Sequence, residues 1–249
     1  MAKALFTNKA LGKGSKAMKI RWLGQAGYEL TDGHHSVLID PYLSDMVFRL
    51  DGFHRLIPTP FTAQEVNADI IIYTHDHADH LDEEMVMGMG QNDICFAGPE
   101  SGRAVLHRCN VAEERYVPLN RGGVLDFAGM HIEAVFAEHT ADSIGLLCTL
   151  KGRKYYFTGD SLLTPEVGKG IQADVIFVCI NGRLGNMNVN EAAELTKRVG
   201  ASVGVPNHYG MFAENTEDPA KYVTALKNTS CTAFVMEYGC EYELSELGK

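Results

Sequence analysis

Three imidazoles and two carboxylates stand within six residues, in the order His75, Asp76, His77, Ala78, Asp79, His80. An apolar run at residues 69–73 precedes them and predicts a buried strand, so the cluster begins where a strand passes into a loop. His75 and His77 alternate in extended backbone and can reach one centre, whereas Asp79 and His80 follow a turn and can face a second. Imidazole and carboxylate ligands suit zinc, iron or manganese. We interpret the cluster as a metal site rather than a histidine-rich surface loop.

An internal repeat indicates where further ligands lie. In the first unit a strand at 69–73 ends at His75, a helix is expected at 82–89 and a short strand at 94–97. In the second unit a strand at 175–180 ends at Asn181, a helix is expected at 190–199, and a strand at 203–205 precedes His208. A hairpin that ends in an acid, Asp40 or Asp160, comes before each unit. Two such halves predict an α/β fold, a four-layer αββα sandwich with two pseudo-symmetric halves.

In this fold the strand ends that carry His75, Asp160, Asn181 and His208 converge on one rim. A pair of metals needs about three protein ligands each and a shared anion. The predicted ligands are His75, His77 and His139 for one centre, Asp79, His80 and His208 for the other, and Asp160 between them. The flanking Asp76 and Asp82 are candidates to accept hydrogen bonds from the ligand imidazoles. The remaining histidines, which have no strand-end partner, are His34, His35, His54, His107 and His131.

Such a centre can supply its own nucleophile, because water held between two divalent cations loses a proton near neutral pH. Asp79 would bind metal and orient the attacking water. In the second unit, Asn181 and Arg183 occupy the place that His75 and His77 occupy in the first, so we predict that they bind substrate. Arg183 suits a phosphate, or else forms an exposed salt bridge. Tyr209, beside His208, would donate to a developing oxyanion, or else pack beneath the ligand loop.

Length and composition narrow the class of protein. The 249 residues predict one domain at 18–249 behind a flexible tail at 1–17. A net charge of −10 argues against a nucleic-acid surface, so a small molecule is the expected partner. Six cysteines without CxxC spacing suggest reduced core residues and a cytoplasmic location. No apolar run predicts a membrane span or a signal peptide. The oligomeric state stays open.

The stretch His-Asp-His-Ala-Asp-His resembles the HxHxDH signature of the metallo-β-lactamase superfamily, and His139, Asp160 and His208 fit its other ligand positions, with a resemblance that runs from about residue 18 to 222. More narrowly, the chain resembles the bacterial L-ascorbate-6-phosphate lactonases at residues 22–24, 74–82, 97–99, 159–161 and 206–219. That resemblance implies a cytoplasmic, metal-dependent hydrolase. The regions around Trp22 and His208 also resemble N-acylphosphatidylethanolamine-hydrolysing phospholipase D. The chain is shorter than the lactonase pattern, and His139 brings it closer to the general two-metal members.

Three functions remain in competition. The first is a metal-dependent hydrolase that uses a metal-bound hydroxide on a small anionic metabolite, of which a sugar-phosphate lactone such as L-ascorbate-6-phosphate is the sharpest version. The second is a metal-dependent phosphodiesterase or nuclease. The third is a non-hydrolytic diiron redox or metal-binding protein; against it, His77 stands where the diiron flavoprotein relatives have glutamate, and no flavin-binding domain follows.

Overall fold

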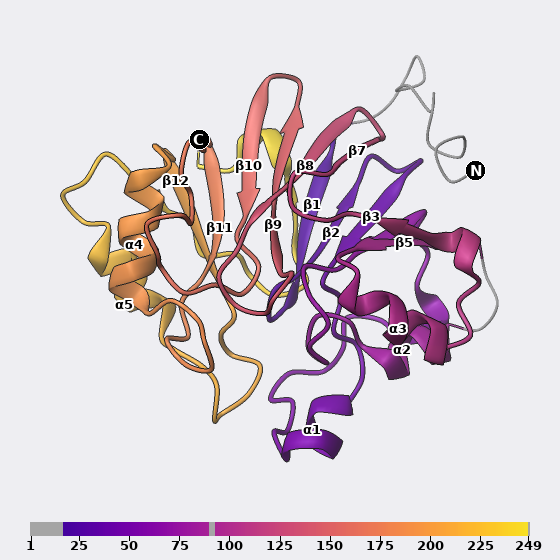
Figure 1. Cartoon of the computed structure of the whole chain (residues 1–249). Coiled ribbons are helices and arrows are strands. Elements are labelled where there is room, and N and C mark those ends of the chain that lie inside the picture. Colours follow the sequence, from indigo (N-terminus) through magenta and orange to yellow (C-terminus); the bar gives the residue numbers. More distant parts are fainter. Residues whose placement is uncertain (1–16, 90–92, 249) are drawn as a thin grey trace.

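The computed structural model describes residues 17–89 and 93–248, which form two β-sheets packed face to face with helices on the outer faces (Figure 1). The predicted tail lies, except for residue 17, outside the described residues. The first sheet has the order β14 (Glu241–Glu243), β1 (Lys19–Gly24), β2 (Gly27–Thr31), β3 (Ser36–Ile39), β4 (Ile70–Ile72), β5 (Cys95–Gly98), β6 (Tyr116–Pro118). The second has the order β13 (Thr232–Ala233), β12 (Val203–Asn207), β11 (Val175–Cys179), β10 (Arg153–Phe157), β9 (Ile144–Leu150), β8 (Met130–Phe136), β7 (Val124–Phe127).

The two sheets repeat one pattern of strand directions. In the first, β1, β2 and β3 are antiparallel, and β3 begins a parallel run through β4, β5 and β6. In the second, β8, β9 and β10 are antiparallel, and β10 begins a parallel run through β11, β12 and β13. An antiparallel strand, β14 or β7, adds to the outer antiparallel edge of each sheet. The predicted pair of pseudo-symmetric halves is therefore confirmed.

The core lies between the sheets because both contribute apolar side chains to the same interface. Every residue of β11 is buried, as expected for a strand covered on both faces. Tyr28 of β2 meets the rings of Phe157 and Phe177 in the second sheet, with centroids 5.3 and 5.0 Å apart. These edge contacts fix the two sheets against each other. All six cysteines are free thiols, and only Cys240 is exposed.

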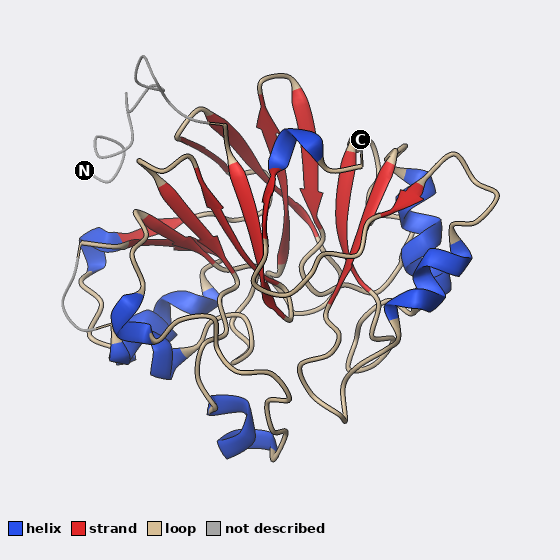
Figure 2. Cartoon of the chain, turned by 180° about the vertical axis from the view of Figure 1, so that it is seen from behind, coloured by secondary structure: helices blue, strands red, loops and turns tan. Residues whose placement is uncertain are grey.

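Helices cover the two outer faces of the sheet pair (Figure 2). They are α2 (Glu83–Gly88) and α3 (Ser101–Arg108) beside the first sheet, and α4 (Val189–Arg198) and α5 (Pro219–Ala225) beside the second. Asn188 caps α4: its side chain accepts hydrogen bonds from the backbone of Asn190 and Glu191, and the Glu191 carboxylate accepts one from the backbone N–H of Asn188. These four layers are the predicted αββα sandwich. None of the described helices is long and apolar enough to cross a membrane.

One helix stands apart from both layers. The short α1 (Met46–Asp51) belongs to the connection between β3 and β4 and projects from the edge of the sheets (Figure 1). It was not anticipated from the sequence pattern. Candidate ligands follow β4, β10 and β12, and the ends of these strands form a rim. The helix α1 lies beside this rim, and its residues Met46, Val47 and Leu50 line the same cleft as the ligands.

Candidate metal centre

The first group of ligands comprises His75, His77 and His139, whose ring nitrogens lie within 4.8 Å of one another. The Nδ1 of His77 lies 3.1 Å from the Nε2 of His139. The Nδ1 of His139 donates to the carbonyl of Gly185 at 3.2 Å, which leaves its Nε2 lone pair for a metal. Gly185 has a φ of +87°, and a Cβ there would stand 2.9 Å from His139 Nδ1. Glycine is therefore required to support this ligand.

The second group comprises Asp79, His80 and His208, again with ligand atoms within 4.8 Å. The Nε2 of His208 lies 3.4 Å from Asp79 Oδ2, and that of His80 lies 3.8 Å from the same oxygen. His208 directly follows β12 and has a φ of +61°, a left-handed backbone conformation that is uncommon outside glycine and is often found at functional sites. His80 and His208 are almost fully buried, so a cation between them would be screened from bulk water.

Asp160 lies between the two groups, in the place that the sequence predicted for it. Its Oδ1 is 3.3 Å from His80 Nε2, and its Oδ2 is 3.2 Å from His208 Nε2 and 3.7 Å from His139 Nε2. One carboxylate thus reaches nitrogens from both groups. The structure brings together all seven predicted ligands, from positions 75 to 208 of the chain.

Asp40 orients the ligand His80, a role that sequence reasoning missed. Its Oδ2 accepts from His80 Nδ1 at 2.9 Å and from the Thr74 hydroxyl at 2.7 Å, while its Oδ1 accepts from the Thr74 backbone at 2.7 Å. Because a carboxylate only accepts, His80 carries its proton on Nδ1 and keeps Nε2 free for metal. The sequence does contain a feature that points to this role of Asp40, because Asp40 ends the first hairpin in the same way as Asp160 ends the second.

The prediction that Asp82 accepts from a ligand imidazole is wrong. Its carboxylate accepts from the backbone of Leu43, Ser44 and Met85, where it caps α2 and fastens the start of the α1 connection. The carboxylate of a residue at the start of a helix commonly accepts from the free backbone N–H groups of that helix, as Asp82 does from Met85. Asp76, the other flanking acid, lines the cleft onto which the ligands open.

Gln25 is a second contact that the sequence did not reveal. It is fully buried in the turn between β1 and β2, with a φ of +51°. Its Nε2 donates to Asp79 Oδ2 at 2.8 Å and lies 3.3 Å from His208 Nε2. Its backbone carbonyl accepts hydrogen bonds from the backbone N–H of His208 and from the Trp22 indole, both at 3.0 Å. One residue therefore positions two of the three ligands of the second group.

Unpaired polar atoms show that these residues fit a cation. Among the described residues, the Nε2 atoms of His75 and His80 and the Oδ1 of Asp160 are buried without a hydrogen-bond partner. Leaving a buried polar atom unpaired costs about 1–3 kcal/mol, so three at one place need an explanation. All three belong to the predicted ligand set, and their residues His75, His80 and Asp160 form a third group whose ligand atoms lie within 4.8 Å of one another, so a divalent cation would satisfy them together.

The charges around the site lead to the same conclusion. Burial, followed by the neighbouring His80, holds the pKa of His75 well below its usual value. Burial also opposes charge on His80 and His208, but the surrounding carboxylates, Asp160 foremost, outweigh it and raise the pKa of His208 to about 9 and that of His80 well above normal. The carboxylates of the site therefore favour positive charge beside them. This arrangement of buried acids suits cations.

A cleft of about 690 Å³ opens onto the ligands. It is lined by His77, Asp79, His139, Asp160 and His208 of the ligand set, and by Met46, Val47, Leu50, Asp51, Phe53, Asp76, Ala78, Leu81, Glu83, Leu184, Phe212 and Asn215. This volume suits a small metabolite, since ligand sites commonly measure roughly 300–1,000 Å³.

The predicted substrate contacts lie apart from this lining. Arg183 is exposed and donates to the carbonyl of Glu214 at 3.3 Å, and Asn181 is buried and donates to Asn215 Oδ1 at 2.7 Å. The ring of Tyr209 packs on Trp22, with centroids 4.9 Å apart, and burial raises its pKa to about 12. The contacts of Tyr209 match the alternative in which it packs beneath the ligand loop. Asn181 acts on the cleft indirectly, by holding Asn215.

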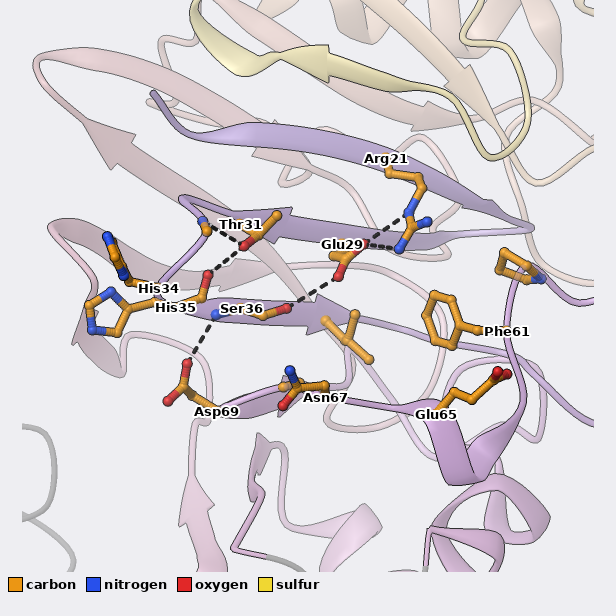
Figure 3. A pocket seen from close by; sticks show the side chains of 14 residues that line it. Arg21, Glu29, Thr31, His34, His35, Ser36, Phe61, Glu65, Asn67 and Asp69 are labelled. Atoms are coloured by element: carbon orange, nitrogen blue, oxygen red, sulfur yellow. Dashed lines mark hydrogen bonds and ion pairs between the residues drawn. The ribbon is translucent and has the colours of Figure 1, made fainter. Parts of the chain in front are cut away.

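A second cleft, of about 480 Å³, lies on the outer side of β2 and β3 (Figure 3). Its polar side chains largely satisfy one another: Arg21 donates to Glu29 at 2.9 Å, and Ser36 donates to Glu29 through its hydroxyl and to Asp69 through its backbone. None of the three metal-binding groups found among the described residues includes a residue of this cleft. The chemistry therefore belongs to the cleft at the rim.

Known proteins resemble the chain in sequence and in fold. The sequence model of the beta-lactamase superfamily domain family matches residues 35–209. A protein of Sulfurisphaera tokodaii named UPF0173 metal-dependent hydrolase is 28% identical over 234 residues, which cover 91% of this chain and 99% of that one. The structure of Igni18, described as a novel metallo hydrolase from Ignicoccus hospitalis, superposes with a TM-score of 0.73 at 20% identity and covers 92% and 100% of the two chains. The metallo-beta-lactamase fold protein YhfI from Bacillus subtilis gives 0.70 at 17% identity, with 91% and 99% covered.

Proposed function

The chain belongs to the beta-lactamase superfamily domain family, and from this premise we propose that it is a metal-dependent hydrolase with two divalent cations at the rim of its sheets. The observation that carries the proposal is the position of Asp160, one carboxylate within 3.7 Å of ligand nitrogens from both groups. The name of the relatives, metal-dependent hydrolase, supports it. Zinc, manganese and iron all suit the mixed nitrogen and oxygen ligands.

Each part of the site then has a role. His75, His77 and His139 would hold one cation, and Asp79, His80 and His208 the other. When bound, such cations lower the pKa of a water and polarise the oxygen of a substrate. Asp79 Oδ2, which lies 2.8 Å from the Gln25 amide, would also accept a hydrogen bond from that water and so orient it.

Two finer predictions also belong to this proposal. The first is a small anionic metabolite, with L-ascorbate-6-phosphate as its sharpest example, which rests on Arg183 in the mirror loop together with the lactonase-like segments. The Arg183 guanidinium donates to the Glu214 carbonyl and is not among the described residues that line the cleft. A phosphodiesterase is the second candidate, because two cations can clamp a phosphoryl group. A redox role has less support, since His77 stands where the diiron flavoprotein relatives have glutamate.

The test is hydrolysis by protein stripped of metal with a chelator and reloaded separately with zinc, manganese or iron. We expect hydrolysis of at least one compound from a panel of lactones, esters, thioesters and phosphodiesters, and its loss after chelation. Hydrolysis that persists at full rate in the stripped protein would contradict the proposal. L-ascorbate-6-phosphate and bis-p-nitrophenyl phosphate belong in the panel, because they decide between the two finer versions.

A further inference from the structure

The walls of the rim cleft are apolar and acidic. The apolar residues are Met46, Val47, Leu50 and Phe53 from the α1 connection, Ala78 and Leu81 from the loop after β4, Leu184 from the loop after β11, and Phe212 from the loop after β12. Beyond the ligand set, the charged residues are Asp51, Asp76 and Glu83. Among the described residues, no lysine or arginine lines the cleft. The walls thus offer apolar contact and negative charge but no partner for an anion.

This charge pattern bears directly on the substrate. Glu83 is paired with Arg108 at 2.6 Å, and Arg108 itself is not among the residues that line the cleft. Asp51 and Asp76 add two further carboxylates beside the centre. An anionic group that lies against these walls, away from the two cations, would lose its hydration next to the acids without gaining a guanidinium or ammonium, whereas sites that recognise phosphate commonly supply one. A neutral substrate avoids this cost.

We propose that the cleft binds a small neutral acyl compound, an ester or lactone whose hydrocarbon chain packs on Leu50 and Leu184. The inference rests on the proposed hydrolase function and names its substrate class. In the reaction, the oxygen of water bonds to the acyl carbon, the bond from that carbon to the leaving oxygen breaks, and the proton of water passes to the leaving alkoxide. The products are a carboxylic acid and an alcohol, and no further reactant is needed.

Leu50 and Leu184 are suited to this role because they are exposed in the free protein. Their exposed fractions are 61% and 66%, although both line the cleft. A hydrocarbon chain that covers them removes apolar surface from water on both sides of the contact. Each methylene of the chain buried in this way should raise kcat/KM about two- to fourfold.

The experiment compares matched p-nitrophenyl esters on the metal-loaded full chain. The neutral series is acetate, butyrate and hexanoate; the anionic partner is the hexanoate with a terminal sulfonate, a weakly coordinating anion, in place of its methyl group. We expect kcat/KM to rise along the neutral series and to fall at least about tenfold when the sulfonate is added. The anilides of the same acids, followed by calorimetry, report binding without turnover.

Two substitutions test the walls. Leu184→Lys and Leu50→Lys should each lower kcat/KM for the neutral hexanoate about tenfold and raise it for the sulfonate. Leu56→Lys is the matched control, because Leu56 is 56% exposed and lies outside the cleft lining, and it should change neither value. Circular dichroism verifies that all three variants are folded.

The outcomes separate the substrate class from the hydrolase function. If the sulfonate ester is hydrolysed as well as the neutral hexanoate and the lysine variants leave both unchanged, the substrate class is wrong while the hydrolase stands. If no ester is hydrolysed but the neutral anilide binds at least about tenfold more tightly than the sulfonated one, the class of ligand holds and the reaction is wrong. Equal or tighter binding of the sulfonated anilide overturns the inference in either case.

Discussion

The amide Nε2 of Gln25 lies 2.8 Å from the Oδ2 of Asp79, although 54 residues separate the two in the sequence. Asp79 is the only carboxylate in the second group of ligands, so this bond fixes the one anionic ligand of that group. The same nitrogen lies 3.3 Å from His208 Nε2. The turn between β1 and β2 therefore determines how Asp79 and His208 meet, while the first group has no contact with Gln25 among those described.

Gln25→Ala should weaken metal binding at the second centre and spare the first. Loss of a residue that orients ligands commonly lowers metal affinity about 10–100-fold. Titration with a chelator and elemental analysis should show one tightly held metal and one that is released early. Gln64→Ala, at an exposed glutamine far along the chain, is the control and should keep the wild-type profile. Equal weakening of both metals would point to a general loss of structure instead.

The helix that covers the second sheet offers a prediction about stability. Asn188 caps α4 by accepting from Asn190 and Glu191 at 2.9 and 3.2 Å, so Asn188→Ala should lower the free energy of unfolding by about 1 kcal/mol. Asn190→Ala changes an exposed residue of the same type within the first turn and should have a smaller effect. Urea denaturation of the metal-loaded proteins measures both. Similar losses in the two variants would show that the cap does not stabilise the fold.

The sequence predicted those features that depend on local pattern. His75, Asp160 and His208 could be placed on one rim for two reasons. Each follows a strand that the hydrophobic pattern and the flanking residues predict, and the ends of parallel strands meet at one sheet edge. Asp40 and Gln25 could not be assigned roles, because their partners are 40 and 54 residues away and are chosen by the packing of the loops. The hydrophobic pattern of a sequence predicts a strand, but it does not predict the direction of a side chain in the loop that follows.

The mirror loop shows the limit of the repeat. Arg183 holds the place that His77 has in the first half, yet its loop closes on itself through a bond from the Gly182 backbone to the Met187 carbonyl at 2.9 Å. Asn181 is drawn at the same time to Asn215. These bonds turn the guanidinium toward Glu214 and bring Leu184 to the cleft instead. The symmetry of the strands thus does not extend to the loops that follow them: the first half places His75 and His77 in the ligand group, whereas Asn181 and Arg183 of the second half bond to neighbouring loops.

Metal content tests the number of cations directly. Protein purified without chelator should contain close to two metals per chain, because seven ligands are gathered where a single metal would use three or four. Reloading the stripped protein should also raise its Tm, since a ligand that binds only the folded state stabilises it by about 2.7 kcal/mol at 100 times Kd. A content near one metal, with no further uptake on titration, would refute a two-metal site.

Substitutions of single ligands should distinguish the two centres from the residue between them. His77→Ala removes a ligand of the first group only, so one metal should be lost. Asp160→Asn should weaken both, because Asp160 lies 3.2 Å from His208 Nε2 and 3.7 Å from His139 Nε2. Both variants should stay folded and lose more than about 99% of turnover, equivalent to at least about 2.7 kcal/mol of barrier.

The control is His131→Ala. His131 lies outside the three ligand groups of the described chain and is paired with Asp126, so this variant should keep both metals and full turnover. Turnover above about a tenth of the wild-type rate in either ligand variant would show that the substituted residue is not essential. Loss of only one metal from Asp160→Asn would show that Asp160 does not serve both centres.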